Sequence, residues 1–296
     1  MSASVSLPRV AFLGLGIMGG GMARRLLGAG FPVAVFNRNR AKADVLATAG
    51  ATVAGTARAA AKDADLVVCM VADDVASRAM WLGNEGALAS APHGAVVVDC
   101  STLSLGWVKE LALAAEMAGC ELVDAPVTGS KAQAAAGELN FLVGGSAPAL
   151  EKARAALNAM GRSVTHFGPT GSGALVKLVN NFLAGVQIAA FAEGLAWLER
   201  TDIDRAKVVE FLLGGAAGSP ITKTVSARMT SGDFSPNFFL RLMAKDLRYA
   251  TIEAASGRES LLTAQAALER FEKALAAGHG DKDMAAVVLP LRQKQT

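Results

Sequence analysis

A glycine-rich turn near the N-terminus constrains the fold of this chain more than any other feature. Residues 14–19 read Gly-Leu-Gly-Ile-Met-Gly, directly after the apolar run Val10–Leu13 and before a helical stretch. In a strand–turn–helix unit with this GxGxxG spacing, the first glycine makes the turn, the second admits a pyrophosphate, and the third lets helix and strand pack closely. We therefore predict a dinucleotide site formed by Gly14, Leu15, Gly16, Ile17, Met18 and Gly19.

The first 165 residues alternate apolar, strand-like runs with alanine-rich helical stretches. The strand-like runs are Arg9–Leu13, Val33–Phe36, Leu66–Met70, Ala95–Val98, Glu121–Asp124 and Leu139–Val143. The helical stretches between them are Met18–Leu27, Arg40–Ala49, Val75–Leu82 and Ser104–Ala118. Such alternation is typical of a mostly parallel sheet covered by helices on both faces. We predict an α/β Rossmann-type domain over residues 1–170.

Strand signals disappear after about residue 170, where Gly171-Ser172-Gly173 marks a hinge and helical apolar spacing begins. We therefore predict an all-α domain over residues 171–296. Its longest apolar run, Phe182–Leu198, contains Glu193, and a charge near the centre of a lipid-facing span is costly. We expect a buried central helix there and no membrane contact. The helical stretches of this domain are Ala174–Glu199, Asp204–Leu213, Ile221–Thr230, Asn237–Ala255 and Leu261–Ala276.

Charge and cysteine content exclude several classes of protein. The net charge is only +3, from 29 basic and 26 acidic residues that are dispersed along the chain, which argues against a nucleic-acid-binding stripe. Cys69, Cys100 and Cys120 are odd in number and form no CxxC pair, so we expect buried thiols, with no disulfide framework and no metal site. The N-terminal residues show no apolar signal-peptide core, and we expect a cytoplasmic protein.

The end of the second predicted strand bears on the choice of dinucleotide. Sites for NAD usually place an acidic residue there to bind the ribose 2′-hydroxyl. This chain has Asn37 and Arg38 after Phe36, and its next acidic residue is Asp44. An arginine fork can hold a 2′-phosphate with paired hydrogen bonds, whereas a carboxylate would repel it. We predict that NADP(H) is preferred over NAD(H), with Asn37 and Arg38 in the cofactor site.

A nicotinamide enzyme that acts on an alcohol or a carbonyl also needs a proton donor and acceptor. The only tyrosine, Tyr249, is followed four residues later by Glu253, so a YxxxK dyad is absent. The cysteines lack histidine neighbours and cannot form a catalytic zinc site. The three histidines lie in turns or near a strand end. A lysine or a carboxylate therefore remains as the acid–base group.

Lys177 is the strongest candidate for that group. It lies among apolar residues at the start of the central helix, just after the glycine hinge, and Asn181 follows one helical turn later. Residues four apart share one face of a helix. A lysine partly removed from water, with an amide beside it, is suited to acid–base chemistry.

Four ordered motifs make the whole chain resemble the β-hydroxyacid dehydrogenase family, which includes 3-hydroxyisobutyrate dehydrogenase and the glyoxylate/succinic semialdehyde reductases. The motifs are Phe12–Gly19, Asp124–Ser130, Gly173–Asn181 and Lys245–Leu247. The Asn37-Arg38 pair looks more like the NADPH-using reductases than like the dehydrogenases with an aspartate at that strand end.

The resemblance implies a role for each matching residue. Lys177 would be the catalytic acid/base, and Asn181 would hold the substrate or position the lysine. Thr128, Gly129 and Ser130 would bind a substrate carboxylate. Ser130 stands where the family often has glycine, and its hydroxyl could instead cap the following helix. The remaining cofactor contacts implied are those of Met70, Val71, Thr102 and, from the helical domain, Lys245.

The function expected from these observations is NADP(H)-dependent interconversion of a small carboxylate-bearing aldehyde or keto acid, of the glyoxylate or semialdehyde type, and its hydroxy acid. Oxidation of 3-hydroxyisobutyrate or a related 3-hydroxy acid is the alternative. An imine reductase is less consistent with Lys177, a phosphogluconate dehydrogenase would need a longer helical domain, and a non-catalytic NADP-binding protein would not need these side chains. The resemblance also implies a homodimer or homotetramer whose helical domains complete one another's sites.

Overall fold

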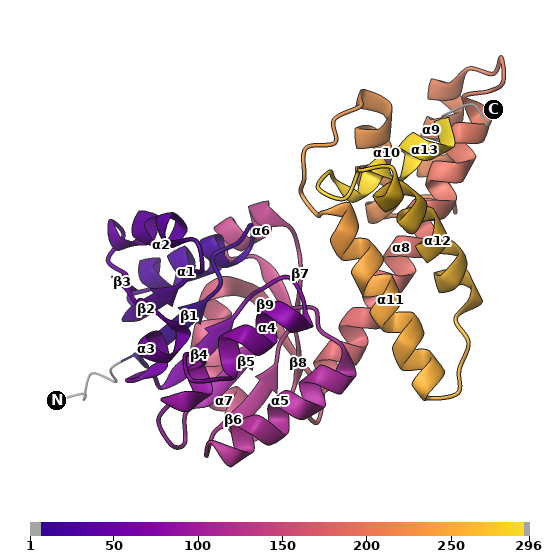
Figure 1. Ribbon diagram of the computed structural model, residues 1–296. Coiled ribbons are helices and arrows are strands. Elements are labelled where there is room, and N and C mark those ends of the chain that lie inside the picture. The colour runs from indigo at the N-terminus through magenta and orange to yellow at the C-terminus, as the bar shows by residue number, and fades with distance from the viewer. Residues whose placement is uncertain (1–6, 293–296) are drawn as a thin grey trace. The chain divides into compact units, whose positions relative to one another are not determined.

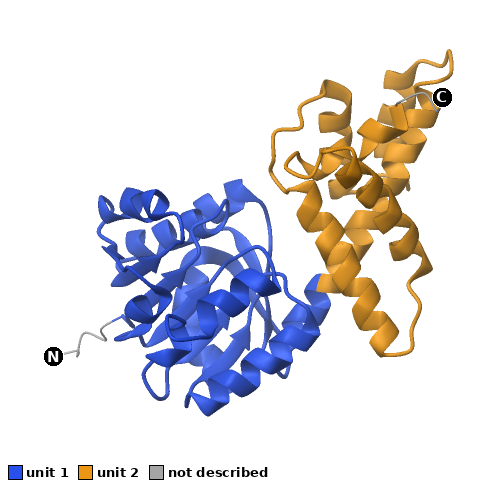
Figure 2. Cartoon of the chain, in the orientation of Figure 1, with its two compact units in different colours: residues 1–177 blue, residues 178–296 orange. Residues whose placement is uncertain are grey.

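The structure, a computed structural model, describes residues 7–292 (Figure 1). The chain divides into two compact units, residues 1–177 and 178–296 (Figure 2). The division falls inside helix α8 (Ser172–Leu198), a few residues beyond the expected boundary after residue 170.

Unit 1 contains a sheet with the strand order β3-β2-β1-β4-β5-β6-β8-β7, in which β9 pairs with β8. Strands β1 to β6 run parallel, β8 runs antiparallel to β6 and β7, and β9 is parallel to β8. The predicted mostly parallel sheet is therefore confirmed. The strands are β1 (Val10–Leu13), β2 (Val33–Phe36), β3 (Thr52–Val53), β4 (Leu66–Cys69), β5 (Val96–Asp99), β6 (Glu121–Asp124), β7 (Val127–Thr128), β8 (Leu139–Gly144) and β9 (Gly161–Gly168).

Both faces of this sheet are buried, which explains why its central strands are apolar without interruption. Val10 and Phe12 of β1 belong to the core on one face, whereas Ala11 and Leu13 belong to the core on the other. The first face is covered by α1 (Gly19–Gly28), α2 (Arg40–Ala47) and α7 (Ala147–Met160), and the second by α3 (Ala57–Ala61), α4 (Asp74–Trp81) and α5 (Leu105–Met117) (Figure 1). All three cysteines are buried free thiols, as expected.

Three strands and three helices of unit 1 lie outside the predicted runs. Strands β3 and β7 are two residues long, which is too short to show a period. Strand β9 buries only Gly161 of its eight residues, so it lacks the apolar pattern of the central strands. Helices α3, α7 and α6 (Lys131–Ala136) were not among the predicted helical stretches.

The described residues of unit 2 form helices, as predicted, apart from one isolated β-bridge between Phe239 and Asp283. After α8 come α9 (Arg205–Gly214), α10 (Pro220–Ser231), α11 (Leu240–Ser256), α12 (Leu262–Ala276), a 3-10 helix (Met284–Val288) and α13 (Leu289–Arg292). Their shared core includes Ile188, Leu247 and Phe271, each with no exposed surface. Among residues 7–292, α8 is the one helix long and apolar enough to cross a membrane by length and composition. A core helix meets the same criteria, and α8 supplies Ile188, Ala192 and Leu195 to this core.

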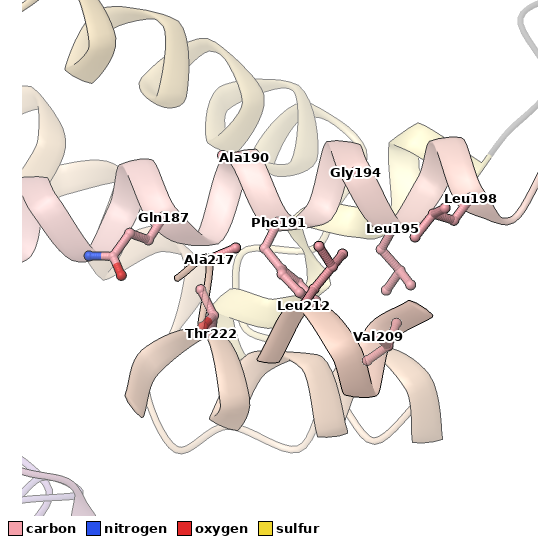
Figure 3. A pocket seen from close by; sticks show the side chains of 10 residues that line it. All are labelled: Gln187, Ala190, Phe191, Gly194, Leu195, Leu198, Val209, Leu212, Ala217 and Thr222. Carbon is pink, nitrogen blue, oxygen red and sulfur yellow. The ribbon is translucent and has the colours of Figure 1, made fainter. Parts of the chain in front are cut away.

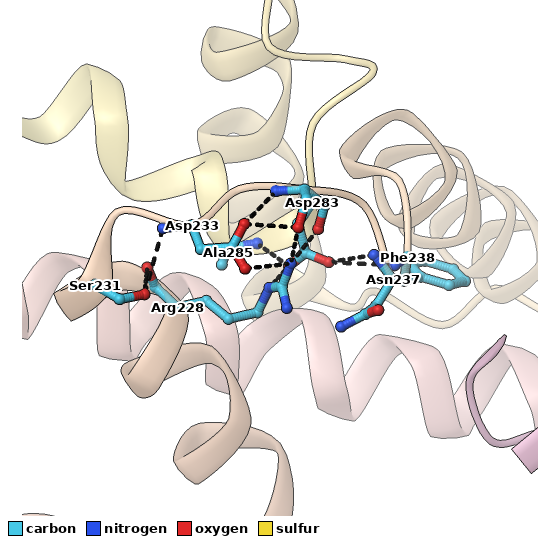
Figure 4. A network of polar contacts seen from close by, with 8 residues as sticks. Arg228, Ser231, Asp233, Asn237, Phe238, Asp283 and Ala285 are labelled. Atoms are coloured by element: carbon cyan, nitrogen blue, oxygen red, sulfur yellow. Dashed lines mark hydrogen bonds and ion pairs between the residues drawn. The ribbon is translucent and has the colours of Figure 1, made fainter. Parts of the chain in front are cut away.

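A network of polar contacts fixes the segment between α10 and α11 (Figure 4). Asp283 is 1% exposed, and its carboxylate accepts the backbone N–H groups of Asn237 and Phe238 at 2.9 and 3.2 Å. It also pairs with Arg228 of α10, with Nε 3.3 Å from Oδ1, while Arg228 donates to the carbonyl of Ser235. The network therefore joins α10, the segment after it and the 3-10 helix.

Candidate functional site

The glycine turn has the features that a dinucleotide needs. Gly14 has φ +93°, and a Cβ there would lie 2.4 Å from the carbonyl oxygen of Met70. A Cβ on Gly19 would lie 2.0 Å from the carbonyl oxygen of Gly14, whereas at Gly16 no atom of the described residues, other than Gly16 and its two neighbours in the chain, lies within 4 Å of the Cβ position. Two glycines are thus required for packing, and the middle one faces open space. This cradle fits a pyrophosphate approaching the N-terminus of α1.

At the end of β2, Asn37 joins the glycine turn to the next helix. Its Oδ1 accepts the N–H of Leu15 at 2.9 Å, and its Nδ2 donates to the carbonyl of Asn39 at 2.8 Å. Asn39 in turn caps α2 by accepting the N–H of Ala41. The amide of Asn37 therefore positions the turn, and the adjacent Arg38 is exposed.

A buried carboxylate organises the loops after β4 and β5. Asp99 is 1% exposed and accepts hydrogen bonds from Trp81 Nε1 at 2.7 Å, Ser77 Oγ at 2.8 Å and the N–H of Ser101 at 2.9 Å. Burial raises the pKa of Asp99, and these hydrogen bonds act in the opposite direction. Ser101 Oγ then accepts the N–H of Val71 at 2.9 Å. The predicted cofactor residues Met70, Val71 and Thr102 thus lie on loops linked by this network, and Met70 and Val71 lie against Gly14 of the glycine turn.

The predicted carboxylate-binding turn follows β7. Thr128 Oγ1 accepts Asn140 Nδ2 at 3.3 Å, a bond that does not use the hydroxyl hydrogen of Thr128. Gly129 has φ +128°, and a Cβ there would lie 2.9 Å from Leu139 Cδ2, so glycine is required. Ser130 caps α6 in a capping box with Gln133, whose Oε1 accepts both the N–H and the hydroxyl of Ser130. The capping role considered for Ser130 is therefore the one present in this structure.

Asp124, at the end of β6, caps the helix that carries Lys177. Its Oδ1 accepts the N–H of Gly171 at 2.7 Å, and its Oδ2 accepts the N–H of Ala174 at 2.8 Å. Burial raises the pKa of Asp124 to about 6, although the backbone hydrogen bonds lower it. Lys177 lies one helical turn beyond Ala174 and is 7% exposed. The lysine is thus buried, as its apolar neighbours predicted.

In unit 2, Asp246 links the two predicted site residues there. Asn181 is 4% exposed, and its Nδ2 donates to Asp246 Oδ2 at 2.5 Å, while its Oδ1 accepts Asn180 Nδ2 at 2.9 Å. Lys245 Nζ lies 2.8 Å from Asp246 Oδ1 and 4.7 Å from the centre of the Tyr249 ring. Asp246 has no exposed surface, and Lys245 and Asn181 both contact its carboxylate.

Sequence reasoning did not assign roles to Asp99, Asp124 or Asp246. One signal was available for Asp246, because it lies at helical spacing from Met243 and Ala250, both on the buried face of α11. An acid at such a position needs a buried partner. The side-chain partners of Asp99, Ser77 and Trp81, and both partners of Asp124 are distant in the sequence and carry no local signal.

Comparisons with known proteins agree with the predicted family and fold. Residues 9–168 match the protein-family model described as "NAD binding domain of 6-phosphogluconate dehydrogenase". Residues 171–291 match the family model described as "NAD-binding of NADP-dependent 3-hydroxyisobutyrate dehydrogenase". The chain is 35% identical to an NAD-dependent L-serine dehydrogenase of Pseudomonas aeruginosa over 288 residues, which cover 95% of this chain and 97% of the relative. It is 34% identical to glyoxylate/succinic semialdehyde reductase 2 of Arabidopsis thaliana, over 96% of this chain and 79% of the relative.

A solved structure extends the agreement to three dimensions. The 3-hydroxyisobutyrate dehydrogenase of Mycobacterium tuberculosis, solved with L-serine, superposes with a TM-score of 0.87 at 32% identity, over 97% of this chain and all of that one. The chain therefore belongs to the 3-hydroxyisobutyrate dehydrogenase-like β-hydroxyacid dehydrogenase family and is an NAD(P)-dependent oxidoreductase of the 3-hydroxyacid dehydrogenase type.

Proposed function

We propose that this enzyme is an NADP(H)-dependent reductase of a small aldehyde or keto acid that carries a carboxylate, of the glyoxylate or semialdehyde type. The observation that carries the proposal is the buried pair on α8: Lys177 and Asn181 are 7% and 4% exposed and lie one turn apart on one helix. A buried ammonium group beside a fixed amide is an arrangement for proton transfer and for binding a polar oxygen.

Each residue then has one task. When bound, the nicotinamide supplies the hydride to the carbonyl carbon, or accepts it in the reverse direction. Lys177, as an ammonium group, donates a proton to the developing alkoxide and recovers it in the reverse direction. Asn181, held by Asp246, orients the substrate oxygen. Thr128 and Gly129 hold the carboxylate, the former through the hydroxyl hydrogen that its bond with Asn140 does not use.

The preference for NADP(H) is supported by the end of β2. No carboxylate stands between Phe36 and Asp44, and Asp44 itself pairs with Arg40, with Oδ1 3.5 Å from Nε. Arg38 is exposed two residues beyond the end of the strand, and its guanidinium is available to a 2′-phosphate. The amide of Asn37 supports the turn, so we assign the contact with the phosphate to Arg38.

Oxidation of a 3-hydroxy acid is the second candidate. Relatives named for L-serine dehydrogenase and 3-hydroxyisobutyrate dehydrogenase are about as similar to this chain as the glyoxylate/succinic semialdehyde reductase is. All of these substrates combine a carboxylate with an alcohol or carbonyl, which the same Lys177 and Thr128 would serve.

The discriminating experiment is a steady-state panel run in both directions. Oxidation of NADPH and NADH is followed with glyoxylate, succinic semialdehyde and an uncharged aldehyde of similar size. Reduction of NADP⁺ and NAD⁺ is followed with 3-hydroxyisobutyrate and L-serine. We expect the highest kcat/KM with NADPH and a carboxylated aldehyde. A higher value with a 3-hydroxy acid and NAD⁺ would favour the second candidate.

The acid–base assignment is tested with Lys177→Ala. Losing a positioned proton donor should lower kcat by about 10²–10⁴-fold. The cofactor rests on the glycine turn and Arg38, so NADPH should still bind with nearly unchanged affinity, as measured by the change in its fluorescence. Turnover near that of the wild type in the folded variant would remove Lys177 from the reaction.

A further inference from the structure

We infer that Asp124 is a positioning residue, which sets the place of Lys177 relative to the Thr128 turn by capping α8 from the end of β6. The inference rests on the proposed function, since it concerns the lysine that is assigned there as the acid/base. It adds a residue that touches neither substrate nor cofactor.

Asp124 caps α8 in an unusual way, because the cap comes from another element. A typical N-cap residue belongs to the chain directly before its helix. Here the carboxylate belongs to β6, yet it accepts the N–H of Gly171, just before α8, and the N–H of Ala174, in its first turn. Both carboxylate oxygens are used, at 2.7 and 2.8 Å, so the helix end is held at two points.

Close backbone packing makes this connection rigid. A Cβ on Gly173 would lie 2.2 Å from the carbonyl oxygen of Leu142 and 2.8 Å from that of Asp124. A Cβ on Gly144 would lie 2.6 Å from Asp124 Oδ1 and 2.8 Å from the N–H nitrogen of Ser172. The first turn of α8 therefore lies directly on strands β6 and β8. Neither glycine can take a side chain without moving the helix.

The two ends of this connection carry the proposed chemistry. Lys177 follows Ala174 by three residues, within one turn of the capped end. On the strand side, Asp124 is followed by a short segment that leads into β7 and Thr128. Asp124, Ala174, Lys177 and Thr128 all belong to unit 1. The carboxylate thus bridges the segment that would bind the substrate carboxylate and the helix that would donate the proton.

Asp124→Asn tests this role because it keeps the shape of the side chain but removes one hydrogen-bond acceptor and the negative charge. The amide nitrogen would face one of the two N–H groups, so the first turn of α8 should loosen. We expect the backbone amides of residues 171–178 to exchange hydrogen faster. The value of kcat should fall by about 10–100-fold, as expected for a small misplacement of a reacting group. The value of KM and the affinity for NADPH should change little. The isotope effect on kcat with C4-deuterated NADPH should rise, because the chemical step becomes slower.

Ser146→Ala is the matched control. Ser146 also caps a helix of unit 1, α7, by accepting the N–H of Ala149, but α7 carries no proposed site residue. It should lower thermal stability and leave kcat and the isotope effect unchanged. If Asp124→Asn behaves like Ser146→Ala, or if the amides of residues 171–178 keep their protection, the positioning role is wrong.

Two further variants keep the test decisive. Lys177→Ala is measured in parallel: if it retains turnover, the proposed acid/base fails and this inference fails with it. If only Lys177→Ala loses turnover, the proposed function stands and the role of Asp124 alone is overturned.

Should Asp124→Asn not fold, Asp124→Glu replaces it, since it keeps the charge but must fit an extra methylene beside Gly144. Lost protection at 171–178 with wild-type kcat would then overturn the inference.

Discussion

At the residue scale, the preference for NADP(H) is predicted to depend on Arg38. Arg38→Asp replaces attraction of a 2′-phosphate by repulsion, and a hydrogen bond to a charged group contributes roughly 1.5–3 kcal/mol. We expect the ratio of kcat/KM with NADPH to kcat/KM with NADH to fall by at least about tenfold, or to invert. Both values are measured at one fixed concentration of the same aldehyde.

Arg40→Asp is the control for Arg38, because it makes the same change of charge two residues later. Arg40 is exposed and pairs with Asp44, with Nε 3.5 Å from Oδ1. Its replacement should leave the cofactor preference nearly unchanged. Equal effects of the two variants, or a wild type that uses NADH as well as NADPH, would show that Arg38 makes no specific contact with the phosphate.

The Thr128 hydroxyl is predicted to recognise the carboxylate of the substrate. Thr128→Ala removes one donor to an anion, so KM for a carboxylated substrate should rise more than KM for an uncharged aldehyde of similar size. A hydrogen bond to a charged group is worth roughly 1.5–3 kcal/mol, or about 10–150-fold. Thr165→Ala, at an exposed position of β9, should change neither value. Equal losses for both substrates in Thr128→Ala would contradict the role.

At the scale of elements, the sequence predicted the strands and helices that a local pattern of apolar residues specifies. Strands β2 and β6 were predicted with their observed bounds, and the five long helices from α8 to α12 within a few residues. Apolar spacing marks all five helices, and in all of them except α9 the apolar residues include buried ones. Helix α7 also carries a local signal, the N-cap residue Ser146 followed by Pro148. The prediction from alternating strands and helices did not use this signal. The exposed strand β9 has no such signal.

The connections between elements could not be predicted in the same way. Asp124 accepts from Gly171, 47 residues away, and Asp246 accepts from Asn181, 65 residues away. Local spacing places Lys177 and Asn181 on one face of a helix, but only the fold shows that Asp124 caps this helix and that Asp246 binds Asn181. The acids around the candidate site therefore become visible through tertiary contacts, while its glycines are visible in the sequence.

The Asp283 network is predicted to stabilise the segment between α10 and α11 (Figure 4). Asp283→Ala leaves the Arg228 side chain, which is 15% exposed, without its buried partner. Breaking a buried pair in this way typically costs about 3–5 kcal/mol. We expect a large shift of the urea unfolding midpoint to lower concentration. Asp281→Ala is the control, since its pair with Arg241 is exposed and such pairs contribute less than about 1 kcal/mol. Equal shifts in the two variants would contradict the role of Asp283.

At the scale of the whole molecule, unit 2 leaves much apolar surface uncovered. Helix α9 has no buried residue, although its sequence includes Val208, Val209 and Phe211, and Phe211 is 79% exposed. On α8, Trp197 is 75% exposed. Between α8, α9 and α10 lies an apolar cavity of about 270 Å³ (Figure 3), lined by Gln187, Ala190, Phe191, Gly194, Leu195, Leu198, Val209, Leu212, Ala217 and Thr222. Large exposed apolar patches mark sites of protein association.

We propose that this surface of α8 and α9 pairs with a second copy of the chain, so that the enzyme is a homodimer or a larger homo-oligomer. Light scattering after size exclusion should give a multiple of the 30.3 kDa chain mass. Phe211→Asp replaces an exposed apolar side chain of α9 by a charge, which is costly to desolvate in an interface, and should shift the mass toward that of the monomer.

Met117→Asp is the matched control for Phe211→Asp, because Met117 is 89% exposed but lies on α5 of unit 1. It introduces the same charge at an equally exposed apolar position and should leave the mass unchanged. A wild-type protein that is monomeric at micromolar concentration would show that the surface of α8 and α9 is not a self-association surface. So would a Phe211→Asp variant that keeps the wild-type mass.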